Sequence, residues 1–254
     1  MADWDGTEYR SVSDLQQWLA ERALDGLNVD GVRSLLDVGC GDGRITAEIA
    51  RRIREAYVVG LDPSPRMKSI APAGGRLAFE LGDVRTMTYQ RQFDAVVSFN
   101  ALHWVSDQLL ALTRIAAALR PSGWALLVFV CAGERPSLES VAMQVVRSAE
   151  WRPYFQGFEA PFVHPDVALW TDTAESCSLR VTDATVDDLA WDFESRDRFV
   201  RWSSVGFGAW TDGLPTGARG AFVGDVIDAY GQATGPASVF RFLQLRARLS
   251  LVVP

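Results

Sequence analysis

The sequence predicts an α/β fold built on a doubly wound, mostly parallel sheet. Three observations indicate it: apolar runs of strand length recur, segments with helical spacing separate them, and several runs end in an acidic or amide residue. The first run covers 34–38 and is followed by glycines at three alternate positions. Behind this turn, Ile45, Ile49 and Ile53 recur at the spacing of one helix face. Strand, tight turn and amphipathic helix together predict the first βα unit of such a sheet.

The remaining elements are expected from the same signals. Ser13-Asp14-Leu15-Gln16 has the form of a capping box and predicts a helix that opens there, before the first strand. Ser106 is expected to cap a helix that ends at Leu119, before the turn Pro121-Ser122-Gly123, and Ser195 to cap a later one. The expected strands cover 34–38, 56–61, 77–81, 94–99, 124–130, 179–181, 184–193 and 239–252, with a further helix over 219–230.

Polar side chains stand where the predicted strands end. The acids Asp37, Asp62 and Asp83 end the first three runs, and Asn100 follows the fourth. Ligands of open parallel sheets bind at this carboxyl edge, and an acid at the end of the second strand can bind ribose hydroxyls. The sequence therefore predicts a nucleoside site at this edge.

The glycine turn helps to choose the nucleoside. Its pattern is G-x-G-x-G, whereas a dinucleotide site has G-x-G-x-x-G and places a pyrophosphate on the helix N-terminus. The carboxylate of Asp37, just before the turn, would repel a pyrophosphate and suits a ligand that carries an ammonium or a sulfonium. A nicotinamide-dependent oxidoreductase is therefore disfavoured.

An acid followed by alternate glycines resembles the first motif of class I S-adenosylmethionine (SAM) methyltransferases, and the similarity extends over about 34–130. Gly82-Asp83 and the turn Leu119-Arg120-Pro121-Ser122-Gly123 also resemble that family. The resemblance implies a seven-stranded sheet with an antiparallel last strand, SAM as cofactor and S-adenosylhomocysteine (SAH) as product. It also implies that Asp83 binds the adenine amino group and that the next backbone N–H meets the ring. The expected cofactor-binding residues are Asp37, Gly39, Cys40, Gly41, Gly43, Asp62, Pro63, Met67, Asp83, Val84 and Asn100.

Two further stretches are similar to trans-aconitate and juvenile-hormone-acid methyltransferases, which methylate carboxylates. One is the N-terminal segment with Tyr9, Gln16 and Gln17, and the other is Asn100-Ala101-Leu102-His103-Trp104-Val105. The resemblance implies that Tyr9, Gln16 or Gln17, and Trp104 contact the acceptor. It also implies one methyltransferase domain over 1–254, with an N-terminal helical cap over 1–30 and an α-helical lid insertion over 131–175, between the fifth and sixth strands.

The acceptor decides whether the reaction needs a base. A carboxylic acid is already an anion at neutral pH, whereas a phenol, amine or alcohol usually loses a proton during transfer. His103, the histidine beside the predicted cofactor edge, is a candidate general base or a residue that positions the acceptor. O-methylation of a carboxylate is the expected reaction. C- or O-methylation of a terpenoid, quinone or polyketide-type molecule, and a non-catalytic SAM-binding protein, stay open as alternatives.

Composition limits the partners. The formal net charge is −7 and no Lys/Arg-rich run occurs, which argues against a nucleic-acid substrate. Three cysteines without CxxC spacing and two histidines do not predict a disulfide framework or a metal site. The N-terminus has no features of a signal peptide and no apolar run reaches membrane-spanning length, so a cytoplasmic protein with a small-molecule acceptor is expected. The sequence does not indicate an oligomeric state.

Overall fold

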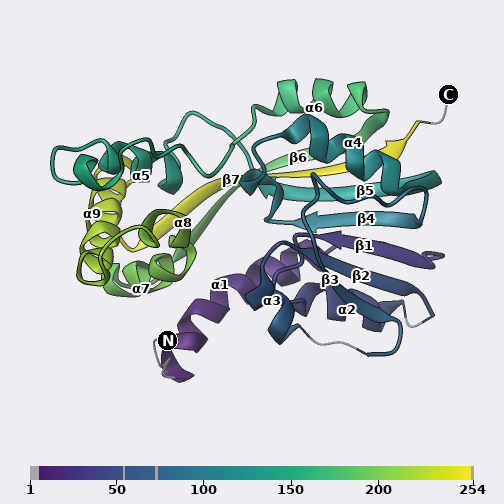
Figure 1. Ribbon diagram of the computed structural model, residues 1–254, viewed down its shortest axis with the longest axis horizontal. Helices are drawn as coiled ribbons and strands as arrows, with labels where there is room; N and C mark the ends of the chain where they lie inside the picture. The colour runs from purple at the N-terminus through teal and green to yellow at the C-terminus, as the bar shows by residue number, and fades with distance from the viewer. Residues whose placement is uncertain (1–5, 54, 72–73, 253–254) are drawn as a thin grey trace. The chain divides into compact units, whose positions relative to one another are not determined.

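The computed structural model describes residues 6–53, 55–71 and 74–252 and contains one seven-stranded sheet. The strand order is β3-β2-β1-β4-β5-β7-β6 (Figure 1), which confirms the predicted doubly wound sheet. The strands are β1 (Ser34–Val38), β2 (Tyr57–Asp62), β3 (Leu77–Leu81), β4 (Phe93–Phe99), β5 (Leu119–Val130), β6 (Leu179–Asp192) and β7 (Val239–Leu251).

Parallel pairing joins the first five strands and brings the ends of β1, β2 and β4 to one edge. Leu36 pairs with Val59 of β2 and with Val96 of β4, and β3 extends the sheet beyond β2. All five residues of β1 are buried, as expected for a central strand covered on both faces. The chain crosses over at β1, where β2 lies on one side and β4 on the other, and this is the position at which open α/β sheets bind ligands.

The last strands are antiparallel, as the resemblance implied. Val130 of β5 pairs with Gln244 of β7, and Trp124 pairs with Ser250. The N-terminal part of β7 therefore lies at the same edge as the C-terminal end of β5. The expectation that β5 begins at Trp124 was wrong: it begins at Leu119, which pairs with Phe93 before an irregularity in the register.

The chain divides into two compact units, and each is described by itself. The sheet unit comprises Ala20–Ala132, Val163–Asp187 and Gln244–Pro254, and the helical unit comprises Met1–Leu19, Gly133–Phe162 and Asp188–Leu243. The helices are α1 (Gly6–Leu24), α2 (Arg44–Arg52), α3 (Pro65–Ile70), α4 (Gln108–Ala118), α5 (Leu138–Val146), α6 (Val167–Ser176), α7 (Arg196–Gly206), α8 (Gly208–Thr211) and α9 (Thr216–Thr234), with short 3₁₀ turns η1 (Leu102–Trp104) and η2 (Arg152–Tyr154).

Two predicted helix starts were wrong. The helix expected to open at Ser13 begins at Gly6, so Ser13 is an interior position of α1. The helix after the fourth strand is capped by Asp107, whose side chain accepts a hydrogen bond from the Leu110 N–H, and not by Ser106. The Ser195 cap of α7 is confirmed, because its side chain accepts from the Arg198 N–H.

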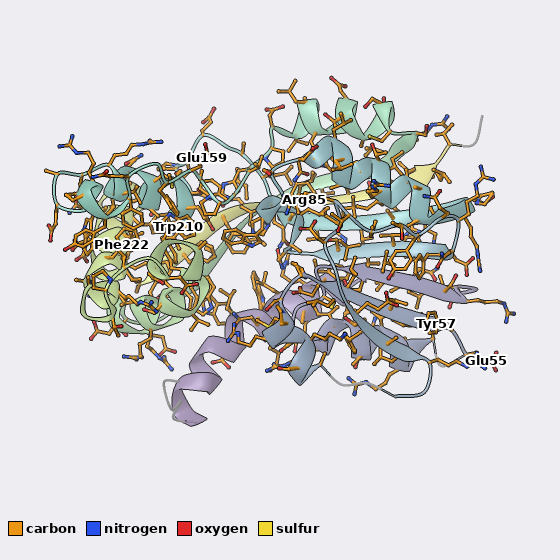
Figure 2. All side chains as sticks on the ribbon, in the orientation of Figure 1. Glu55, Tyr57, Arg85, Glu159, Trp210 and Phe222 are labelled. Atoms are coloured by element: carbon orange, nitrogen blue, oxygen red, sulfur yellow. The ribbon has the colours of Figure 1, made fainter. Side chains whose placement is uncertain are left out.

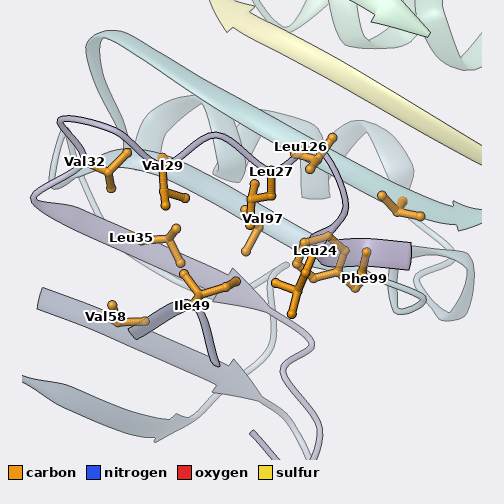
Figure 3. Packing of buried hydrophobic residues seen from close by; sticks show 13 residues of the cluster. Leu24, Leu27, Val29, Val32, Leu35, Ile49, Val58, Val97, Phe99 and Leu126 are labelled. Carbon is orange, nitrogen blue, oxygen red and sulfur yellow. The ribbon is translucent and has the colours of Figure 1, made fainter. Parts of the chain in front are cut away.

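A core of buried aliphatic side chains covers one face of the sheet unit (Figure 3). Leu24 at the end of α1, Leu27 just after it and Ile49 of α2 pack in one cluster with Leu35 of β1 and Val97 of β4. Successive side chains of a strand point to opposite faces of the sheet, so the residues next to these in sequence lie on the other face. There α4 contacts β4 and β5, and Trp170 of α6 packs on Phe129 with ring centroids 5.1 Å apart. Helices on both faces bury the central strands.

The C-terminal end of α1 is fixed to β7 by an arginine. Arg246 donates to the backbone carbonyls of Arg22, Ala23 and Asp25, the last at 2.8 Å. The last carbonyls of a helix lack partners within the helix, and a cation there also opposes the negative end of the helix dipole. One side chain thus satisfies the end of α1 and ties it to the sheet.

The helical unit has an aromatic core, in which α9 contacts α5 and α7. Phe222 of α9 meets Trp151 and Phe155, both with ring centroids 5.1 Å apart, and Trp210 of α8 meets Phe207 at 4.8 Å (Figure 2 labels Trp210 and Phe222). Trp151 also donates from Nε1 to Asp225. The aromatic residues of 151–162 therefore pack this unit. The lid expected over 131–175 supplies helices to both units: α5 lies in the helical unit and α6 in the sheet unit.

Candidate cofactor and acceptor site

The glycine turn after β1 is held by the ends of β1 and β2. The backbone N–H groups of Gly39 and Cys40 donate to the carbonyl of Leu61 at 2.7 and 3.2 Å. The N–H of Gly41 donates to Asp62 Oδ2 at 2.9 Å. The second strand therefore fixes the turn through both its main chain and its terminal acid.

Three glycines with positive φ make the turn, and they differ in what surrounds them. A Cβ on Gly39 would overlap the Cβ of Ala101, and one on Gly43 would overlap the ring of Phe79. A Cβ on Gly41, where φ is 56°, would meet no described atom within 4 Å. Gly39 and Gly43 thus allow the turn to pack against its neighbours, while Gly41 leaves an open surface on which a ligand can lie close to the backbone.

Asp37 is the buried acid of the site. It is 1% exposed, and its Oδ2 accepts a hydrogen bond from the Thr46 hydroxyl at 2.6 Å. Its Oδ1 is also buried and has no hydrogen-bond partner within the described part of the chain. Burial raises the pKa of Asp37 to about 7, with the Thr46 bond opposing this shift and the Asp62 charge adding to it. A ligand ammonium at Oδ1 would satisfy both the unpaired oxygen and the charge.

Asp62 stands at the end of β2, and each of its oxygens accepts one hydrogen bond from the residues that the structure describes. Oδ2 accepts from the Gly41 N–H, and Oδ1 accepts from the Ser64 N–H at 2.8 Å. A carboxylate oxygen has two lone pairs, so each can accept one further hydrogen bond, as a ribose diol requires. Pro63 is exposed beside it, and Met67 lies in the first turn of α3, where its N–H donates to the Ser64 cap.

Asp83, the predicted adenine ligand, is paired with an arginine that the sequence analysis did not identify. Arg85 donates from Nη2 to Oδ2 at 2.6 Å and from Nε to Oδ1 at 3.0 Å (Figure 2 labels Arg85). These hydrogen bonds lower the pKa of Asp83. An adenine amino group would share this carboxylate with Arg85. Val84 beside it is buried.

Asn100 follows β4 in a left-handed conformation, with φ of 53°. Its backbone N–H donates to the Val128 carbonyl, and its side-chain oxygen accepts from Gln244 Nε2 at 2.7 Å. Gln244 is buried and reaches this edge because β7 runs antiparallel to β5. The Asn100 oxygen keeps one further lone pair, and the amide N–H groups of Asn100 are hydrogen-bond donors. Gln244 was not predicted from the sequence. The one feature that could have indicated it is that this polar residue stands between Leu243 and Leu245.

The chain's two histidines lie together in the sheet unit. His103 is 4% exposed, its ring centroid lies 6.0 Å from that of His164, and its carbonyl accepts from the Val163 N–H at 2.7 Å. Burial, reinforced by His164, lowers the pKa of His103 to about 3, and burial lowers that of His164 to about 4. Both imidazoles are therefore neutral near pH 7. Nδ1 of His103 is buried without a partner among the residues that the structure describes.

The predicted acceptor residues occupy different environments. The indole of Trp104 is 41% exposed and lies 5.1 Å from the His103 ring, centroid to centroid. Gln16 and Gln17 are exposed on α1. The side chain of Tyr9 lies outside the described residues, although its backbone belongs to α1. The roles of Tyr9, Gln16 and Gln17 stay predictions.

Cys40 is unsuited to act as a nucleophile. Its thiol is partly buried in the glycine turn, and burial together with the charges of Asp37 and Asp62 raises its pKa. The thiol therefore stays protonated near neutral pH and serves the turn by packing.

Three features of these residues are suited to binding SAM. The unpaired oxygen of Asp37 suits an ammonium, the open face of Gly41 allows a ligand to lie close to the backbone, and the Asp62 oxygens can accept hydrogen bonds from a ribose. SAM supplies a methyl group on a positively charged sulfur, which suits an edge lined by carboxylates. The strand order β3-β2-β1-β4-β5-β7-β6, with acidic residues at the carboxyl edge of the parallel strands, is typical of Rossmann-like proteins that bind nucleosides.

Comparison with known proteins shows the family to which the chain belongs. Residues 35–123 match the methyltransferase domain family. Trans-aconitate 2-methyltransferase of Mycobacterium sp. (strain KMS) is 31% identical over 189 residues, which cover 74% of this chain and 72% of that protein. The enzyme of the same name from Methylobacterium radiotolerans is 38% identical over 124 residues, about half of each chain at 48%. The chain belongs to the family of SAM-dependent methyltransferases that includes these enzymes.

A solved structure shows the same fold. The O-methyltransferase from the trans-AT PKS multienzyme of Brevibacillus brevis, in complex with S-adenosyl-L-homocysteine, aligns with a TM-score of 0.60 at 14% sequence identity. The alignment covers 96% of this chain and 75% of that one. Along the described ranges, no helix is both long and apolar enough to cross a membrane.

Proposed function

We propose that this methyltransferase transfers the methyl group of SAM to a carboxylate oxygen of a small, partly apolar molecule. The observation that carries the proposal is the environment of His103, the imidazole next to the predicted cofactor edge. With a pKa of about 3, this side chain is a weak base near neutral pH. An acceptor that is already an anion matches such a site better than one that must be deprotonated.

A carboxylate needs only to be held in line with the sulfur–methyl bond. Carboxylic acids have pKa values near 4 and are ionised at neutral pH, and orientation alone can supply about 7–11 kcal/mol of the barrier. A neutral imidazole can donate one hydrogen bond to the acceptor while remaining neutral. We assign this positioning role to His103, with Trp104 beside it as an apolar wall.

The relatives support the same acceptor class. Two proteins that share 31% and 38% identity with this chain carry the name trans-aconitate 2-methyltransferase. The name describes those enzymes, and for this chain it suggests an unsaturated carboxylic acid as the first molecule to test.

Matched acceptor pairs test the proposal. SAH formation is measured with trans-aconitate and other small carboxylic acids, and with their primary amides and alcohols as controls. Turnover with acids and not with their amides is expected. Turnover with a phenol, quinol or enol and with no acid would replace the proposal by the base-dependent alternative. SAM binding without turnover on any acceptor would favour a non-catalytic binding protein.

A further inference from the structure

Thr46 and Asp37 form a buried pair that the family resemblance does not explain. Thr46 lies on α2 and is 0% exposed, and its hydroxyl donates to Asp37 Oδ2 at 2.6 Å. The other oxygen of the carboxyl group, Oδ1, is buried and unpaired among the described residues. An ionised carboxylate with one oxygen unsatisfied in a buried site is costly, whereas a protonated one is tolerated.

The neighbours of Asp37 also disfavour its negative charge. The carboxylate of Asp62, from the end of β2, raises the pKa of Asp37, and the charges of both acids raise the pKa of the Cys40 thiol in the turn. On the β4 side, the Ser98 hydroxyl donates to the Val38 carbonyl at 2.8 Å and brings no charge. Thr46 is the group that favours the ionised form, because its hydroxyl donates to the carboxylate.

We propose that donor binding releases a proton from Asp37 and that Thr46 is the positioning residue that sets the pH range of this coupling. Without ligand and below about pH 7, Asp37 holds a proton on its carboxyl group for most of the time. When the ammonium of SAM or SAH binds at Oδ1, the O–H bond breaks, the proton leaves to solvent and an ion pair forms. Thr46 keeps Oδ2 engaged and leaves Oδ1 for the ligand. The inference rests on Asp37 lying next to the donor's amino group and is independent of the acceptor.

His103, His164, Asp83 and Cys40, which also belong to the sheet unit, do not titrate in the same range. His103 and His164 have pKa values of about 3 and 4, so both are neutral above pH 6. The pKa of Asp83 is lowered and that of Cys40 is raised, so neither changes charge near neutrality. Asp37, with a pKa of about 7, is the group whose proton a cationic ligand would displace.

Calorimetry with SAH tests the coupling, because SAH carries the same amino acid group and cannot react. Titrations at pH 6 in two buffers of different ionisation enthalpy give the number of protons released. A carboxyl group with a pKa of about 7 is about 90% protonated at pH 6, so release of about 0.9 proton per SAH is expected. The α-amino group of SAH, with a pKa of about 8, is already an ammonium at this pH.

Two matched controls isolate the source of the proton. 5′-Methylthioadenosine shares the nucleoside of SAH but lacks the amino acid group, so it should bind without proton release. The D37N variant should release no proton with either ligand. SAH binding by the wild-type protein without proton release would overturn the inference and leave the SAM site standing. Absence of SAH binding altogether would instead remove the SAM site.

Substitutions of Thr46 test its positioning role. In T46V the hydroxyl is replaced by a methyl group of similar size, so ionised Asp37 loses its donor. The midpoint of the curve of SAH affinity against pH should rise by about one pH unit, with about fivefold weaker binding at pH 7. T46S keeps the hydroxyl and should restore the wild-type midpoint. If the role of Thr46 were merely structural, T46V would bind SAH more weakly by the same factor at every pH. An unshifted midpoint in T46V would overturn the assignment of Thr46 as the positioning residue.

Discussion

Gly39 and Gly41 offer a direct comparison of a glycine that serves packing with one that faces a ligand. Both have positive φ, 73° and 56°, so alanine brings similar backbone strain at the two positions. They differ in the space around a Cβ. At Gly39 it would overlap the Cβ of Ala101, and at Gly41 it would meet no described atom within 4 Å.

The expected losses follow from these surroundings. A left-handed alanine costs about 1–2 kcal/mol, which is partly offset by the stiffer unfolded chain. For Gly41→Ala we therefore expect a loss of about 1 kcal/mol in the free energy of unfolding. Gly39→Ala adds overpacking of about 1–3 kcal/mol against Ala101, for a total of about 2–4 kcal/mol. SAH affinity should fall at least tenfold in Gly41→Ala, because the new methyl group occupies the ligand's surface.

Urea unfolding and SAH calorimetry measure the two effects separately. We expect Gly41→Ala to lose only about 1 kcal/mol of stability relative to the wild-type protein and to bind SAH poorly. Gly39→Ala should be clearly less stable, with affinity within about tenfold of wild type under conditions where it is folded. Wild-type affinity in Gly41→Ala would show that the ligand does not pass over this glycine. Equal stability of the two variants would refute the packing role of Gly39.

Three further predictions concern the acids and His103. In the ligand-free protein the pKa of Asp37 is raised, so the contribution of Asp37 to stability fades as pH rises from about 4 to about 7. Asp37→Asn should therefore raise the free energy of unfolding at pH 8 by up to about 4 kcal/mol. Urea titrations at pH 4 to 8 measure this gain, and a gain that does not change with pH would contradict the prediction. Asp62→Ala removes the acceptor of the Gly41 and Ser64 N–H groups and should weaken SAH binding about 30-fold, and unchanged affinity by calorimetry would remove Asp62 from the site. His103→Asn should lower kcat/KM with a carboxylate by tenfold or less at saturating SAM, whereas a loss of 10²-fold or more in initial rates would identify a general base.

The central sheet could be predicted because its strands are continuous apolar runs that are buried on both faces. The strand expected over 77–81 agrees with β3, and the run 34–38 agrees with β1. Strand ends were also predictable: parallel strands meet at one edge, so Asp37, Asp62 and Asn100 could be placed there together. The start of α1 was not, because Asp5-Gly6-Thr7-Glu8 and Ser13-Asp14-Leu15-Gln16 both have the spacing of a capping box, and the local pattern alone does not choose between them.

The partners of the site residues could not be predicted, because they come from distant parts of the chain. Gln244 reaches Asn100 across 144 residues and through an antiparallel strand, whose N-terminal part lies at the carboxyl edge. His164 reaches His103 because the Val163 N–H bonds to the His103 carbonyl, which no local pattern reports. These contacts engage the side-chain oxygen of Asn100 and add to the burial that keeps His103 neutral.

The chemical nature of the transferred methyl group tests the central claim most directly. The protein is incubated with SAM labelled in its methyl group and with the acceptor that supports turnover, and the purified product is treated with mild alkali. A methyl ester of a carboxylate releases its label as methanol, and we predict near-complete release. Label that stays in the product after alkali would show an ether or a carbon–methyl bond, and would contradict carboxylate methylation by a site without a strong base.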